Sequence, residues 1–114
     1  MPYLKIQSNQ PILAGEQAKI VTDASALVAA EVEKPENYVM VALDPTLPMS
    51  FAGSDAPCAY LELKSIGLPE SKCEALSSKL CEFINHAMGI ATDRIYIEFA
   101  DAPRSMWGWN KGTF

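Results

Sequence analysis

The sequence has a single histidine, His86, and only three cysteines, an odd number that does not form a disulfide framework. Cys73 and Cys81 are eight residues apart on a predicted helix, too far for a direct bridge, and Cys58 belongs to no CxxC pair. We therefore expect three free thiols. A zinc site lacks ligands, and a Ser-His-Asp triad would have to use His86, which lies in a helical pattern beside Asn85.

Basic runs and long apolar runs are also missing. The 9 Lys and Arg residues are outnumbered by 14 Asp and Glu residues, giving a net charge of −5, which disfavours nucleic acid and anionic membranes as partners. The longest apolar run, Tyr38–Leu43, is far shorter than the roughly 20 residues that span a bilayer. The N-terminal residues show no signal-peptide apolar region, so we expect a cytoplasmic protein, with export without a signal as the alternative.

Conventional catalytic motifs are absent as well. The chain contains no GxGxxG, no phosphate-binding Walker loop, no GxSxG and no cluster of metal ligands, so we expect neither a cofactor nor a metal.

The composition is that of a folded globular protein: 49% of the 114 residues are hydrophobic and 20% are charged. That length is enough for one domain, residues 1–114, and too short for two.

The chain repeats itself once, with an offset of 57 residues. Residues 2–8 and 59–65 both alternate as strands do, and residues 38–43 fall on residues 95–100, which are equally rich in β-branched and aromatic side chains. The offset divides the chain into pseudo-repeats of about 1–56 and 57–105, followed by a C-terminal segment, 106–114.

A helical pattern lies between the two strands of each repeat. In the first repeat the pattern stops at Lys34-Pro35; in the second, Pro69 suits the first turn and Gly89 the C-terminal cap. The sequence thus predicts an α+β (α/β) fold of two β-α-β units, in which a four-stranded mixed sheet carries both helices on one face. The apolar positions at helical spacing are Ile20, Ala24, Leu27 and Val28 in the first repeat, and Cys73, Leu76, Leu80, Phe83, Ile84 and Ala87 in the second.

The open face of that sheet needs a cover, because the strand around Val39–Leu43 is apolar on both sides. The C-terminal segment, with Met106-Trp107-Gly108-Trp109, is also strongly apolar, and little chain remains to bury it. We expect an oligomer with residues 106–114 at the subunit interface.

Pro2 is the one residue that suggests chemistry. Removal of Met1 would leave a secondary amine on a rigid ring, and apolar walls with a nearby cation would lower its pKa toward that of a useful base. The alternative is that Pro2 merely opens a strand. If Met1 is retained, the Pro2 nitrogen is an amide and cannot act as a base.

Several motifs in order along the whole chain resemble the macrophage migration inhibitory factor family of the tautomerase superfamily, close to the D-dopachrome tautomerases. The matching stretches are Met1-Pro2, Lys34-Pro35 with Tyr38, Met49-Ser50-Phe51-Ala52-Gly53-Ser54, Ala56-Pro57-Cys58-Ala59, Ser65-Ile66-Gly67, Asp93-Arg94-Ile95-Tyr96-Ile97, Gly108-Trp109-Asn110 and Thr113-Phe114.

The resemblance implies a homotrimer and a cofactor-free keto–enol tautomerase of phenylpyruvate-like α-keto acids, with dopachrome as an alternative substrate. By this resemblance Pro2 is the general base and acid, Lys34 holds the substrate carboxylate and the backbone N–H of Ile66 binds the substrate. The family positions that line the pocket, some of them contributed by the adjacent subunit, correspond here to Tyr38, Tyr96, Trp109 and Phe114.

Departures from the family pattern bear on which ligand fits. Glu98 stands where the animal cytokines have Asn, Trp107 where they have a small aliphatic residue, and Ala100 where they have an aromatic one. Leu61 breaks the CxxC to which their thiol-oxidoreductase activity is ascribed. We expect Glu98 to disfavour anionic groups at the ring end of the pocket and Trp107 to narrow its mouth. The alternative function is cytokine-like signalling, in which the trimer surface binds a protein receptor.

Overall fold

The computed structural model describes all residues from Met1 to Phe114. Short 3₁₀ turns lie at residues 36–38, 70–72, 92–94 and 104–106. Neither helix has the length and apolar content that crossing a membrane requires. The regular elements, in chain order, are β1 (Tyr3–Ser8), α1 (Ala14–Val32), β2 (Met40–Asp44), β3 (Ala59–Ile66), α2 (Cys73–Met88), β4 (Ile95–Ala102), β5 (Gly108–Trp109) and β6 (Gly112–Thr113).

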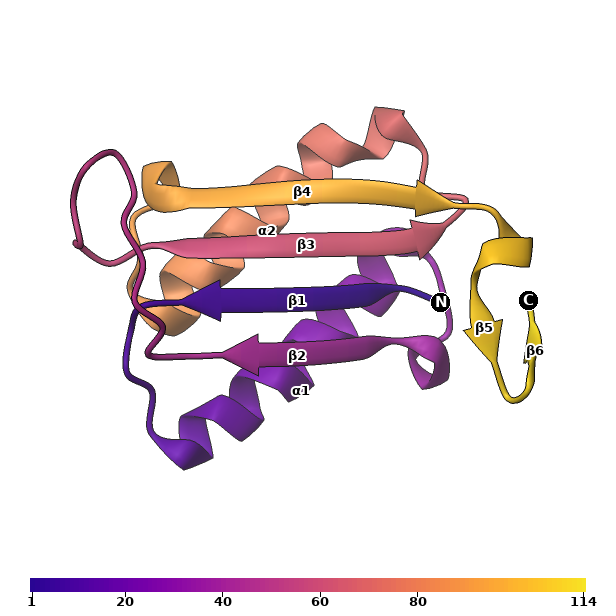
Figure 1. The fold of residues 1–114 in the computed structure, drawn as a ribbon, viewed down its shortest axis with the longest axis horizontal. Helices are drawn as coiled ribbons and strands as arrows, with labels where there is room; N and C mark the ends of the chain where they lie inside the picture. Colours follow the sequence, from indigo (N-terminus) through magenta and orange to yellow (C-terminus); the bar gives the residue numbers. More distant parts are fainter.

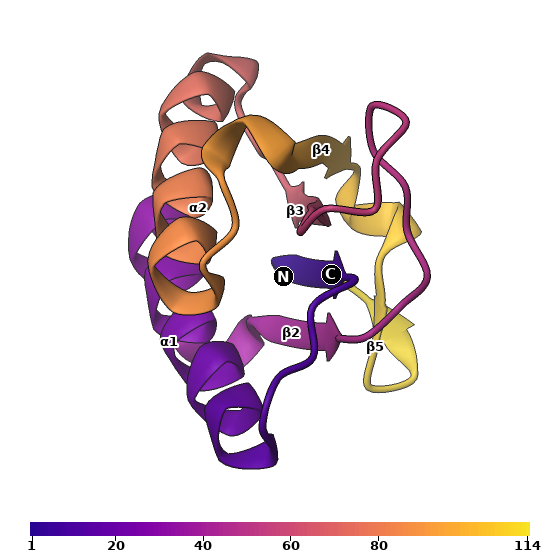
Figure 2. The same cartoon turned by 90° about the vertical axis from the view of Figure 1, so that its left-hand side faces the viewer.

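Four strands form one mixed sheet in the order β2-β1-β3-β4 (Figure 1). β1 runs parallel to β2 and β3 runs parallel to β4, as the β-α-β pattern predicts. The two units meet through the antiparallel pair β1 and β3, where Ile6 lies opposite Leu61. Figure 2 shows both helices on the same face of the sheet, which confirms the predicted architecture.

The core lies between the helices and this face. Each helix contributes a row of buried side chains at helical spacing, and each central strand contributes alternate residues. The predicted stripe on the second helix is broader than the observed one, because Ala87 is exposed and Cys73 and Phe83 are half-buried. The buried residues that form the helix rows are Ile20, Ala24, Val28 and Val32 on α1, and Leu76, Leu80 and Ile84 on α2.

The helix ends agree with the sequence at two of the three predicted positions. α1 ends at Val32, and its C-cap residue Glu33, directly before Lys34-Pro35, adopts a left-handed φ of 56°. α2 ends at Met88, and its C-cap residue Gly89 has a φ of 68° and donates its N–H to the Asn85 carbonyl at 2.9 Å. Pro69 is not in the first turn of α2: it is extended and precedes the 3₁₀ turn that leads into the helix.

The open face of the sheet is more polar than predicted. On β2, Val41 and Leu43 turn toward the helices, and only Met40 and Ala42 place apolar side chains on the open face. β1 and β3 put alternate polar side chains there, with Lys5 opposite Glu62. The apolar run on β2 therefore describes that strand and not the sheet as a whole.

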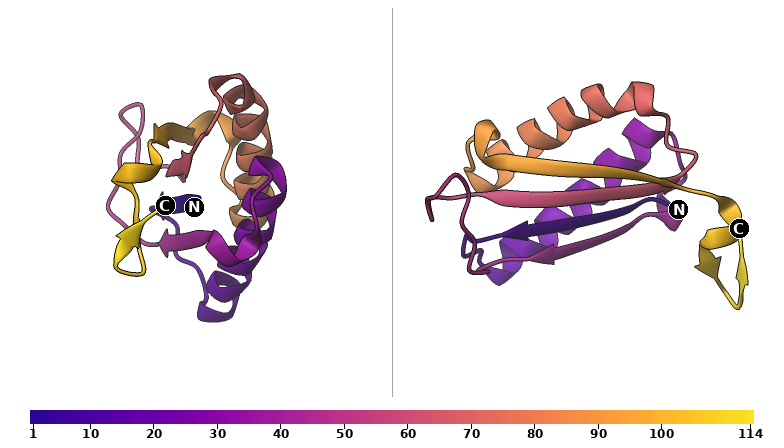
Figure 3. Two further views of the ribbon diagram at one scale, coloured as in Figure 1. Left: turned by 90° about the vertical axis from the view of Figure 1, so that its right-hand side faces the viewer. Right: turned by 45° about the horizontal axis from the view of Figure 1, so that its top comes forward.

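Beyond the end of β4 the chain turns into the small β5–β6 hairpin, which stands apart from the sheet (Figure 3). Asn110 and Lys111 form its two-residue turn, with φ values of 50° and 70°. Positive φ at both positions matches the twist of a tight hairpin. The Phe114 N–H donates to the Trp107 carbonyl at 3.2 Å and so closes the base of the hairpin.

Candidate active site

A cavity of about 390 Å³ lies where β1 begins and the hairpin folds back. This is the end of the sheet at which both chain termini lie (Figure 1). Seven of the lining residues are hydrophobic, so the cavity suits a ligand with an apolar body. The cavity is lined by Pro2, Tyr3, Asn37, Tyr38, Val39, Met40, Lys64, Trp107, Gly108, Trp109 and Phe114.

Pro2 is buried and fixed at the start of β1. Its carbonyl accepts a hydrogen bond from the Met40 N–H at 3.0 Å, which ties the residue just before β1 to the first residue of β2. In this chain the free amine belongs to Met1, and the Pro2 nitrogen is an amide. Burial lowers the pKa of the Met1 amino group below its ordinary value, and the positive charge of Lys34 lowers it further.

Lys34 acts on this end of the chain without lining the cavity. It follows the left-handed Glu33, and its N–H donates to the Ala29 carbonyl at 3.0 Å, so the last turn of α1 fixes its backbone. Its positive charge lowers the pKa of the Met1 amine, the residue next to Pro2.

Three aromatic rings form one wall of the cavity. Trp109 and Phe114 stack with ring centroids 5.4 Å apart and an interplanar angle of 15°. Tyr38 packs edge-on against both, with centroids 5.8 Å away in each case. Since Tyr38 lies between α1 and β2, these contacts attach the C-terminal hairpin to the first half of the chain.

Lys64 is the charged lining residue that sequence reasoning missed. It lies on the open face of β3, opposite Tyr3. The signal was available in the alternation of Tyr60, Glu62 and Lys64, which places all three side chains on one face of a predicted strand. Lys64 gives the cavity a cation of its own in addition to Lys34.

Ile66, Tyr96 and Glu98 do not line this cavity. Ile66 ends β3 as a buried residue, beside the turn that leads to α2. Tyr96 is 66% exposed and lines a separate cavity of about 330 Å³, where its ring lies 4.6 Å from that of Phe51. Within one chain, therefore, Tyr96 and Glu98 are apart from Pro2.

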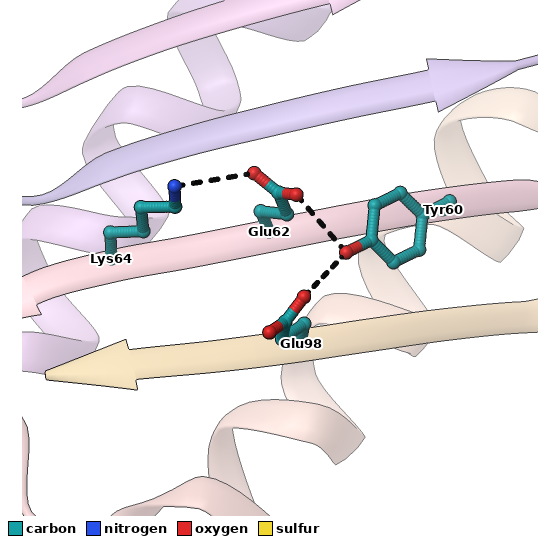
Figure 4. A network of polar contacts seen from close by, with 4 residues as sticks. All are labelled: Tyr60, Glu62, Lys64 and Glu98. Atoms are coloured by element: carbon teal, nitrogen blue, oxygen red, sulfur yellow. Dashed lines mark hydrogen bonds and ion pairs between the residues drawn. The ribbon is translucent and has the colours of Figure 1, made fainter.

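Glu98 takes part in a polar network on the open face (Figure 4). The Tyr60 hydroxyl lies 2.8 Å from the Glu98 carboxylate and 3.1 Å from that of Glu62, whose other oxygen is 3.7 Å from Lys64 Nζ. These contacts raise the pKa of Tyr60, mainly because the hydrogen bond to Glu98 favours the protonated phenol. Glu98 is thus an exposed strand residue whose carboxylate accepts a hydrogen bond from Tyr60.

Arg94 fixes the loop beside Tyr96. Its guanidinium donates four hydrogen bonds to backbone carbonyls of the loop between β2 and β3, and it lies 5.2 Å from the centre of the Phe51 ring. Arg94 forms no ion pair with a carboxylate, so the dipoles of these carbonyl groups are what stabilises its positive charge. The acceptors are the carbonyls of Pro57 at 2.9 Å, Ala56 at 3.1 Å, and Phe51 and Ser54 at 3.2 Å.

The three cysteines are free, with Cys58 buried and the other two half-buried. No group of three or more His, Cys, Asp or Glu side chains is arranged to hold a metal ion. The main cavity brings together Pro2, Lys64 and the aromatic wall.

Comparison with known proteins agrees with this arrangement. The model of the family described as "Macrophage migration inhibitory factor (MIF)" matches residues 1–114. The macrophage migration inhibitory factor homolog of Brugia malayi is 36% identical over 115 residues, covering 100% of this chain and 99% of the relative. The macrophage migration inhibitory factor of Xenopus tropicalis is 36% identical over 98 residues, covering 83% and 84%.

Solved structures give the same result. The macrophage migration inhibitory factor homologue from Prochlorococcus marinus superimposes with a TM-score of 0.93 at 40% identity, covering 98% of both chains. The factor from Trichinella spiralis superimposes with a TM-score of 0.90 at 33% identity, covering 98% of this chain and 99% of the other. With its internal repeat, its sheet order and its Pro2 cavity, this chain belongs to the macrophage migration inhibitory factor family.

Proposed function

We propose that this protein is a keto–enol tautomerase of phenylpyruvate-like α-keto acids, with the amine of Pro2 as its base once Met1 has been removed. The observation that carries the proposal is the position of Pro2 in a largely apolar cavity, directly after a Met1 amine whose pKa is lowered by burial and by Lys34. A base with a lowered pKa is neutral over more of the physiological range, which suits it to taking a proton from carbon.

The proton transfer balances without a cofactor. In the keto substrate, the bond from hydrogen to the carbon beside the carbonyl breaks, and the proton passes to the Pro2 nitrogen. The electron pair of the broken bond forms the carbon–carbon double bond of the enol, the π electrons of the carbonyl move to its oxygen, and the Pro2 ammonium delivers its proton to that oxygen. In the reverse direction the Pro2 ammonium returns its proton to carbon.

Binding follows from the charges and the apolar wall around Pro2. Lys34 and Lys64 attract the carboxylate of the α-keto acid. Ile66 does not line the cavity within one chain, and its role as a backbone N–H donor to the substrate rests on the family pattern. The rings of Tyr38, Trp109 and Phe114 pack against the substrate ring and keep water from the amine, while Trp107 narrows the opening. The exposure of Trp109, 55%, leaves room for this contact.

The test is the rate of phenylpyruvate ketonisation by protein whose intact mass shows that Met1 is gone. We expect turnover well above the buffer rate, and its loss in processed Pro2→Ala. Lys79→Ala is a suitable control, because Lys79 is an exposed lysine on α2 outside the cavity. Wild-type turnover by processed Pro2→Ala would rule out the proline mechanism.

The pH dependence gives a second test. Proton abstraction requires the neutral amine, so activity in the enolisation direction should rise through a pKa below that of an exposed N-terminal amine. Lys34→Ala removes the second cause of the lowering, and the rising limb should therefore move to higher pH. An unmoved limb would mean that Lys34 acts only on substrate.

We also propose that the functional unit is a homotrimer in which Tyr96 and Glu98 of one copy complete the pocket around Pro2 of the next. The support is that both residues lie outside the Pro2 cavity of their own chain, and that Tyr96 and Met106 are 66% and 78% exposed. Sedimentation at micromolar concentration should give a trimer that added salt barely weakens, because exposed apolar residues such as Tyr96 and Met106 supply most of the proposed contact.

A shared pocket makes a distinctive prediction for mixed trimers. Pro2→Ala chains and Tyr96→Ala chains, each impaired alone, should regain activity when unfolded and refolded together. Random assembly in equal amounts places an intact Pro2 beside an intact Tyr96 in about a quarter of the sites of a closed ring. Without recovery, or with a monomer in sedimentation, the shared pocket is excluded.

A further inference from the structure

Asp101 connects two parts of the proposed site. Its Oδ1 accepts hydrogen bonds from the Gly67 N–H at 2.7 Å and the Leu68 N–H at 3.2 Å. Gly67 and Leu68 directly follow Ile66 at the end of β3, and Asp101 lies near the end of β4, where Ser65 is its register partner. One carboxylate oxygen therefore joins the exits of two neighbouring strands.

Both exits lead to residues that the proposed function uses. On β3, Ile66 lies two positions after Lys64, which lines the Pro2 cavity. On β4, Ala102 and Pro103 lead into the 3₁₀ turn that precedes Trp107. Figure 1 shows the β3 exit and the start of the C-terminal hairpin at the same end of the sheet.

The turn after Ile66 is held at Gly67 by its backbone conformation and at Leu68 by burial in the core. Gly67 has a φ of 71°, which an L side chain rarely adopts, and Leu68 is 9% exposed within the core. The two N–H groups between these anchors point to Asp101, which is their only side-chain acceptor. A charged acceptor with two backbone donors is a strong and directional contact.

Resting on the proposed function, we infer that Asp101 is a positioning residue. It holds the Ile66 turn at a fixed distance from the strand end that leads to Trp107 and Trp109, so that substrate meets the turn and these two side chains at a fixed spacing. Asp101 itself touches neither the cavity nor Pro2. Its removal should therefore weaken substrate binding more than it slows proton transfer.

The experiment compares Asp101→Ala, Asp101→Asn and Asp93→Ala in the phenylpyruvate assay. Asp93 is the matched control: it is an exposed aspartate at the other end of β4 with no side-chain hydrogen bond or ion pair. We expect Asp101→Ala to raise KM about tenfold, the scale of one charge-assisted hydrogen bond, with kcat changed less than about threefold. The amide oxygen of Asp101→Asn still accepts both N–H groups and should restore most of the affinity.

Tryptophan fluorescence supplies a readout that needs no turnover. The chain has two tryptophans, Trp107 and Trp109, both in or beside the hairpin. Their emission should shift in Asp101→Ala and remain unchanged in Asp93→Ala. Gly67→Ala, which strains the same turn without a steric clash, should raise KM in the same way.

The outcomes separate the inference from the function beneath it. A lower melting temperature with unchanged KM and unchanged fluorescence would make Asp101 a structural cap only and overturn the inference. If Asp101→Ala and Asp101→Asn raise KM equally, the negative charge of Asp101 matters and its hydrogen bonds to the turn do not, which also overturns the inference. An inactive wild type with Met1 removed would refute the tautomerase proposal first, and the inference would fall with it.

Discussion

Replacing Arg94 tests how the loop between β2 and β3 is held. Four backbone carbonyls converge on this guanidinium, and three of these hydrogen bonds are partly buried. Exposed carbonyls recover water when the side chain is lost, so we count about 1 kcal/mol for each partly buried bond and nothing for the exposed one. Arg94→Ala should then lower the free energy of unfolding by about 3 kcal/mol.

Arg94→Lys makes the prediction sharper. Lysine keeps the positive charge but has no planar fork, so it can reach only one or two of the four carbonyls. It should still lose about 2 kcal/mol. The loss would show that geometry, more than charge, fixes the loop.

The assay is urea unfolding at one fixed protein concentration, followed by circular dichroism, because assembly would make the midpoint concentration-dependent. Arg104→Ala serves as control: Arg104 is exposed, and its side chain makes no hydrogen bond or ion pair, so the change should stay within about 0.5 kcal/mol. A loss below about 1 kcal/mol in Arg94→Ala would refute the reasoning, since the four contacts would then contribute no more than one ordinary hydrogen bond.

Three further substitutions test single contacts. Ser8→Ala should cost about 1–3 kcal/mol in urea unfolding, because the fully buried hydroxyl donates to the Cys58 carbonyl at 2.8 Å and no water can replace it. Gly89→Ala should cost about 1 kcal/mol, since φ is 68° but nothing lies within 4 Å of an added Cβ; a neutral result would contradict the left-handed cap. Glu33 has a lowered pKa because Lys72 donates to it at 2.6 Å, so its stabilisation is complete above the ordinary carboxyl range and is lost as pH falls through the lowered value. Lys72→Ala should raise the Glu33 pKa in an NMR titration, and an unchanged value would exclude the contact.

The sequence predicted those parts of the fold that local patterns encode. Alternation located the strands, helical spacing located both helices, and Gly89 marked an end by its conformational freedom. The extended Pro69 was misplaced because proline favours both a first helical turn and the residue before one. The polarity of the open face was missed because one apolar strand, β2, was taken to represent the sheet.

The site was predictable only where residues act through their chemical type. Pro2 could be singled out because an N-terminal proline is a secondary amine, and the aromatic residues of the wall could be assigned because they match family positions along the chain. Lys64 was overlooked because a lysine on an alternating strand looks like any solvated residue. The Arg94 contacts leave no trace in the sequence, since their acceptors are backbone carbonyls about 40 residues away that any side chain can carry.

The order of the strands also governs how the chain can fold. β1 is the first strand made, yet it lies in the interior of the sheet, and it needs β2 on one side and β3, residues 59–66, on the other. A nascent chain that does not yet include β3 carries Leu4 and Ile6 on a strand whose β3 edge is unpaired. It also lacks α2, so these two side chains are incompletely covered. The first repeat therefore cannot finish its sheet before the second is made, and folding is delayed until more than half of the polypeptide has left the ribosome.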